Sequence, residues 1–90
     1  MIRAIFYRGE KKISGSVFIQ NRHVQFISSA GGEPLVDWDE FAIQAKMEQG
    51  YLHIYSTVNT DELLVVQDGA FRKHLLQQME VRRLADPLYG

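Results

Sequence analysis

The three histidines are the residues best suited to acid–base or metal chemistry in this chain. They are spread along it, at His23, His53 and His74. A zinc site needs three or four ligands that converge on the metal, and no two of these histidines have the spacing of ligands on one element. The sequence also has no cysteine, no nucleophile-elbow motif and no phosphate-binding glycine loop. We therefore expect no enzymatic activity, no metal and no cofactor.

An acidic segment, "EPLVDWDEF", surrounds the single tryptophan. Asp37, Asp39 and Glu40 could bind a hard cation through their carboxylates, but we favour a solvated, acidic strand end. Trp38 falls on the opposite side of this strand from Asp37 and Asp39, beside Val36. We expect Trp38 to anchor the core, where burial removes about 150–250 Å² of its surface from water.

The segment "GYLHIYST" alternates between core-type and aromatic-polar residues. This alternation predicts a strand, on which Tyr51, His53 and Tyr55 face away from Leu52 and Ile54. The three residues form either the solvated face of a sheet, with cross-strand pairs worth about 0.2–1 kcal/mol each, or a contact surface, because tyrosine is enriched in protein interfaces. The solvated face is the simpler interpretation. If the domain has a partner-binding surface, we place it here.

The last third of the chain is basic. Arg72 and Lys73 lie near the start of an expected C-terminal helix, and Arg82 and Arg83 near its end. These residues could contact anionic lipid or an acidic partner, at about 1 kcal/mol per basic residue near a charged membrane. They are sparse for that role. We favour a solvated face, with Arg82 and Arg83 complementing the helix dipole, and expect at most weak peripheral membrane contact.

Composition sets broader limits. The chain has 90 residues, a net charge of −1 and 46% hydrophobic residues, which indicates one globular domain over residues 1–90. There is no basic stripe of the kind that binds nucleic acid. No apolar run reaches the ~18 residues of a membrane span, and no signal peptide is evident. We expect a cytoplasmic protein.

The elements that must position these residues are mostly strands. Period-two alternation runs from about residue 3 to residue 67, interrupted by the turn segments "GEKK", "QNRH", "SSAGGEP", "QG" and "VNTD". Gly15 inside a strand suggests a bulge or a close backbone approach. Asn21 tolerates positive φ, which favours a tight hairpin turn.

The segment "LVDWDEFAIQAKME" permits two predictions. Its good helix formers would allow a helix, but alternation favours a strand with Phe41, Ile43, Ala45 and Met47 on one face. The "QG" hairpin turn that follows supports the strand, which we prefer.

A helix is expected over residues 69–84, with Asp68 as its N-cap and a short tail over residues 85–90. Its apolar stripe should seal one end of the sheet. The stripe consists of Phe71, Leu75, Leu76 and Met79. The predicted fold is mainly β (α+β): a small antiparallel barrel or roll of six to seven strands, capped by one C-terminal amphipathic helix.

This order of elements resembles a bacterial pleckstrin-homology-like (GRAM-like) domain. Three segments carry the resemblance: "GSVFIQNRHVQFIS" is similar to a hairpin of these domains, "PLVDWDEF" to a strand leading away from a loop, and "DGAFRKHLLQQM" to the closing helix. The spacing of "FYRGEKKISGSVFIQ" and "LLVVQDGAFRKHL" also resembles the small N-terminal domain of some bacterial membrane-associated zinc metallopeptidases. The resemblance spans about residues 3–80.

Two features of those families are missing. The peptidase motif HExxH is absent, and so is the dense basic cluster that holds inositol phosphates in eukaryotic pleckstrin-homology domains. Arg8, Lys11 and Lys12 are the only candidates in the first hairpin, and Glu10 lies among them. The resemblance implies a non-enzymatic binding module that engages a protein partner. The alternatives are a self-associating structural protein, such as a homodimer, and an accessory regulatory subunit of a membrane-associated enzyme or transporter.

Overall fold

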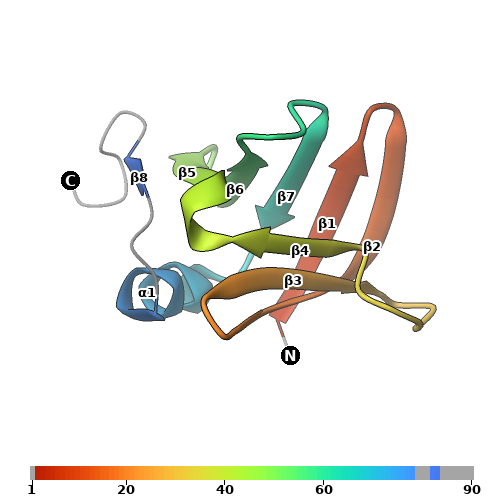
Figure 1. The fold of residues 1–90 in the computed structure, drawn as a ribbon, viewed down its shortest axis with the longest axis horizontal. Helices are drawn as coiled ribbons and strands as arrows, with labels where there is room; N and C mark the ends of the chain where they lie inside the picture. Colours follow the sequence, from red (N-terminus) through yellow and green to blue (C-terminus); the bar gives the residue numbers. More distant parts are fainter. Residues whose placement is uncertain (1, 79–81, 84–90) are drawn as a thin grey trace.

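The structure is a computed structural model that describes residues 2–78, 82 and 83 (Figure 1). Seven strands precede one helix: β1 (Ile2–Arg8), β2 (Lys11–Gln20), β3 (His23–Ser28), β4 (Val36–Asp39), β5 (Ile43–Glu48), β6 (Tyr51–Ser56), β7 (Glu62–Val66) and α1 (Gly69–Gln78). A short 3-10 helix, η1 (Glu40–Ala42), joins β4 to β5, and a two-residue strand, β8 (Arg82–Arg83), comes after α1.

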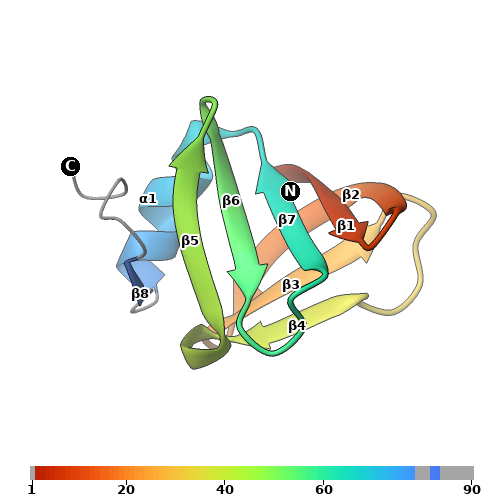
Figure 2. The ribbon, with the colours of Figure 1, turned by 90° about the horizontal axis from the view of Figure 1, so that it is seen from above.

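All strands belong to one sheet, in the order β4-β3-β2-β1-β7-β6-β5-β8. The pairs among β1 to β7 are antiparallel, and β1 is central because it pairs with β2 on one side and β7 on the other. The sheet curls into a half-barrel (Figure 2), and α1 contacts β6. The prediction of a small, mainly β, barrel-like fold with one terminal helix is confirmed.

Tight turns set the register of the hairpins. Asn21 and Arg22 have φ of 52° and 62°, and Gln49 and Gly50 have φ of 55° and 84°. Positive φ at both central residues is the type I′ geometry, whose twist matches that of the flanking strands. The hairpin turns expected at "QNR" and "QG" are therefore confirmed.

Gly15 allows β2 and β3 to approach each other closely. It is buried and pairs in register with Ala4 and Ser28. A Cβ atom at this position would lie 2.1 Å from the backbone oxygen of Ile27 and 2.7 Å from the ring of Phe26. Of the two explanations that the sequence allows, close approach is the correct one.

The core fills the concave side of the sheet. Phe6 lies at its centre, with ring centroids 5.6 Å from Phe26 and 6.3 Å from Trp38. Trp38 is only 7% exposed and lies opposite Val24. The structure therefore places Trp38 on the core side of β4, away from Asp37 and Asp39, which are exposed.

The continuous strand expected through residue 41 is wrong. Asp39 accepts a hydrogen bond from the backbone N–H of Phe41 at 2.8 Å and caps η1. This local bond competes with the strand ladder, so Phe41 is 65% exposed and does not share the face of Ile43 and Ala45, which are buried. Met47 is partly buried against the core, as expected.

Asp68 caps α1 as predicted, because its carboxylate accepts a hydrogen bond from the N–H of Ala70 at 2.9 Å. Phe71 and Leu75 are fully buried and belong to the hydrophobic core. Met79, the side chain of Leu76 and the tail over residues 85–90 lie outside the described part of the structure.

The expected extension of the helix to residue 84 is wrong. Arg82 and Arg83 instead form β8, which pairs in parallel with Gln44 and Ala45 of β5. Strand β5 would otherwise end the sheet with unpaired backbone groups, and such an edge is a template for another strand.

Leu75→Ala should destabilise the domain by about 2–5 kcal/mol, because it removes a fully buried side chain and leaves a cavity. Chemical denaturation would measure the loss, which is large beside the about 5–15 kcal/mol of a typical domain. Gln77→Ala, at an exposed position of the same helix, is the control and should change stability little. Equal melting of Leu75→Ala and the parent would contradict docking of α1.

Candidate protein-binding face

The convex side of the sheet carries apolar and aromatic side chains on three adjacent strands, β6, β7 and β1. Strand pairing aligns them in two rows that begin on β5: Lys46, His53, Val65 and Ile5 in one, and Gln44, Tyr55, Leu63 and Tyr7 in the other. Their neighbours along each strand point into the core. We call the following seven residues the outer face: Ile5, Tyr7, Tyr51, His53, Tyr55, Leu63 and Val65.

The outer face remains partly accessible to solvent. Tyr51 is 42% exposed, and the other six residues are half-buried by their neighbours in the sheet. A row that places Tyr55 beside Leu63, and Leu63 beside Tyr7, is more apolar than the solvated side of a typical antiparallel sheet. The arrangement can bury aromatic and aliphatic area against another surface.

Sequence alternation found Tyr51, His53 and Tyr55 but missed the four residues contributed by β1 and β7. A signal for these was present. The runs "AIFY" and "LLVV" are apolar at successive positions, and such runs indicate strands with apolar side chains on both faces.

Polar contacts hold the β6 side chains in place. The hydroxyl of Tyr55 donates a hydrogen bond to Glu48 Oε2 at 3.3 Å, and Lys46 Nζ lies 5.6 Å from the centroid of the Tyr55 ring. The rings of His53 and Tyr55 stack with centroids 6.3 Å apart. Because these contacts fix the ring orientations, less side-chain entropy would be lost when the face is covered.

The environment of Tyr55 stabilises its neutral phenol. Burial raises the pKa of Tyr55 above its usual 10.0, and the nearby carboxylate of Glu48 also raises it, while the charge of Lys46 opposes both effects. Tyr55 is therefore a neutral hydrogen-bond donor at neutral pH.

The four basic residues expected on one helix are divided between two elements. Arg72 and Lys73 lie on α1, whereas Arg82 and Arg83 form β8 against β5. The proposed helix-dipole role of Arg82 and Arg83 is therefore wrong, since neither residue belongs to α1. In the part of the chain that the structure describes, no helix is long and apolar enough to cross a membrane.

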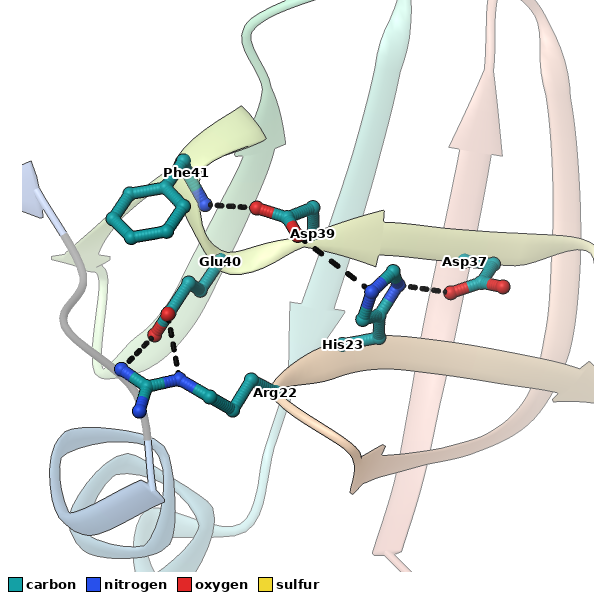
Figure 3. Close-up of polar contacts among 6 residues, drawn as sticks. All are labelled: Arg22, His23, Asp37, Asp39, Glu40 and Phe41. Atoms are coloured by element: carbon teal, nitrogen blue, oxygen red, sulfur yellow. Dashed lines mark hydrogen bonds and ion pairs between the residues drawn. The ribbon is translucent and has the colours of Figure 1, made fainter.

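A second group of polar residues joins the β2–β3 turn to η1 (Figure 3). Arg22 Nε and Nη2 donate hydrogen bonds to the two carboxylate oxygens of Glu40, at 2.6 and 2.9 Å. Glu40 is only 3% exposed, and its N–H also donates to the carbonyl of Arg22 at 3.2 Å. The buried, paired carboxylate of Glu40 therefore connects the β2–β3 turn to η1. The expectation of a solvated carboxylate at Glu40 is wrong.

The two aspartates of β4 are also engaged. His23 Nδ1 lies 2.6 Å from Asp37 Oδ1, and His23 Nε2 lies 3.6 Å from Asp39 Oδ2 (Figure 3). Among the described residues, no group of three or more histidine or carboxylate side chains has an arrangement that could hold a metal ion. The acidic segment thus connects β3, β4 and η1.

Comparison with protein-family models, with curated proteins and with solved structures found no match to this chain.

Arg22→Ala should destabilise the domain by about 1–3 kcal/mol, because it leaves the buried carboxylate of Glu40 without its charged hydrogen-bond partner. Arg22→Lys, which keeps the charge but not the paired geometry, should lose less. Lys12→Ala, at an exposed position on β2, is the control. Unchanged urea unfolding of Arg22→Ala would show that the ion pair does not tie η1 to the sheet.

The contribution of Tyr55 to folding stability should depend on pH only in alkaline solution. Because the pKa of Tyr55 is raised in the folded state, the unfolded chain loses this proton at lower pH than the folded chain does. The stabilisation that Tyr55 contributes is therefore complete below about pH 10 and is lost as pH rises through the folded pKa. Thermal melts between about pH 9 and pH 11 should show a smaller loss for Tyr55→Phe than for the parent. Parallel curves would contradict the raised pKa, since the other titrating groups are common to both proteins.

Proposed function

We propose that this protein is a non-enzymatic, pleckstrin-like binding module that engages a protein partner through the outer face. The architecture supports the pleckstrin-like part of the proposal: two antiparallel meanders meet at β1, and a C-terminal helix contributes Phe71 and Leu75 to the core. This is the element order that the sequence resemblance implies.

The observation that carries the proposal is the pair of rows across β6, β7 and β1. A domain this small needs its apolar residues inside, yet Leu63, Val65 and Ile5 point outward beside Tyr55 and His53. Patches that combine aromatic and aliphatic groups with polar tips are typical of protein interfaces.

The surrounding charges favour a protein over a membrane as the partner. Strand β5, at one border of the outer face, carries both Lys46 and Glu48, which lie 3.6 Å apart, so this border offers no net positive charge to anionic lipid. At the other border, Lys12 lies opposite Tyr7 and Arg3 lies two residues before Ile5; these two basic residues do not form a dense cluster. The whole chain has a net charge of −1. Electrostatic attraction to a membrane needs clustered basic residues near the contact.

Self-association through the same face is the second candidate. The edge of the sheet at β4 is unsuited to strand pairing between copies, because β4 is short and carries Asp37 and Asp39, a pattern that discourages edge pairing. At the opposite edge, β8 already pairs with Gln44 and Ala45 of β5. A homodimer would therefore use the outer face of both copies around a twofold axis. Regulation of a neighbouring enzyme or transporter would use the same surface.

Tyr55→Ala and Val65→Lys should weaken association about tenfold or more while preserving the fold. A few anchor side chains carry most of an interface's binding energy, and Tyr55→Ala removes such an anchor, whereas Val65→Lys places a charge in an apolar contact. Sedimentation of the pure protein tests self-association, and quantitative capture from the native host's extract tests a partner. Gln25→Lys adds the same charge on β3, outside the outer face, and is the control. Variants that lose stability but keep every association would make the outer face a scaffold only.

A further inference from the structure

A cavity of about 450 Å³ lies on the convex side of β1 and β2. Its residues come from neighbouring strands: Arg3 lies directly opposite Ser16 on β2, and Ser14 lies two residues before Ser16 on the same face. Gln67, which follows β7, lines a further part. The volume is within the range of small-molecule pockets, which is about 300–1,000 Å³.

The hollow arises from side-chain size. Ser14 and Ser16 are small, and Gly15 between them has no side chain. The long side chain of Arg3, on the neighbouring strand, lines the opposite side of the cavity. The rim on the side of β3 is tied down, because the Ser29 hydroxyl donates a hydrogen bond to the backbone oxygen of Ser14 at 2.8 Å. The small side chains of Ser14 and Ser16 therefore leave an open cavity, and the Ser29 hydrogen bond fixes its border on the side of β3.

Several side chains around the cavity can donate hydrogen bonds but have no acceptor bound to them. Within the described residues, Arg3 makes no hydrogen bond or ion pair, whereas Arg8 on the same strand pairs with Glu62 at 2.7 Å. The hydroxyls of Ser14 and Ser16 and the amide of Gln67 also have no hydrogen-bond partner there, and none of the described residues that line the cavity is acidic. An exposed guanidinium beside free hydroxyls suits an oxyanion.

We propose that this cavity binds a small oxyanion, the carboxylate or phosphate group of a soluble ligand. Arg3 donates charge-assisted hydrogen bonds to two of its oxygens, Ser14 and Ser16 donate hydroxyl protons, and Gln67 contributes its amide N–H. The cavity adjoins the outer face, because Ile5 lines both, but the proposal depends on different groups, the polar side chains of Arg3, Ser14 and Ser16.

The test is titration of the amide resonances of the whole protein with inorganic phosphate and, separately, with succinate, at constant ionic strength. We expect saturable shifts at residues 3–5, 14–16 and 67 with one or both anions. Binding of phosphate alone assigns a phosphate group, and stronger binding of succinate assigns a carboxylate. Shifts that do not saturate with either anion, or that spread over all basic residues, would overturn the proposal.

Two pairs of variants separate a built site from general charge attraction. Arg3→Gln should weaken binding about tenfold, whereas Lys12→Gln, which removes the same charge from the same side of the sheet, should change it less than about twofold. Ser16→Asp places a carboxylate opposite Arg3 and should abolish binding, while Ser16→Asn, of similar size and uncharged, should retain most of it. Equal effects within either pair would exclude the assigned roles.

Discussion

The fold depends on the double pairing of β1. Phe6 lies opposite Ile13 on one side and Leu64 on the other, so a single strand joins the meander of β1–β4 to the meander of β5–β7. Because side chains alternate with period two, a slip of one residue would turn Phe6 outward and Ile5 inward. The register of β1 therefore decides the core and the outer face together.

The gap between β4 and β5 is bridged by side chains instead of a strand ladder. In the described part of the chain these two strands do not pair with each other, and η1 carries the chain from one to the other. The bidentate pair of Arg22 and Glu40 and the backbone bond from Thr57 N–H to the carbonyl of Ala42, at 2.8 Å, hold this crossing. A bidentate ion pair with one buried partner suits such a place because its geometry is directional, although its net contribution to stability is modest.

Local signals in the sequence were sufficient for the strands, the hairpin turns and the N-cap of α1. The sequence could not predict the break at Asp39, because a side-chain hydrogen bond to the next turn competes with strand pairing over only two residues. Strand β8 was also missed, since two residues carry no periodicity. The rows of the outer face required the register between β1 and β7, and the cavity beside Arg3 required the placement of Gln67 after β7. No local pattern reveals either, because β1 and β7 are far apart in the sequence.

The pairing of Ala4 with Val66 also has a consequence for synthesis of the chain. During translation, β1 to β4 emerge and can pair long before β7 leaves the ribosome. One edge of β1 then stays open, with apolar side chains on both of its faces. Such an edge is a template for pairing between nascent chains, and closing it depends on a contact between distant parts of the sequence, which is slow to form. Until β7 arrives, β1 therefore presents an unpaired edge to other chains.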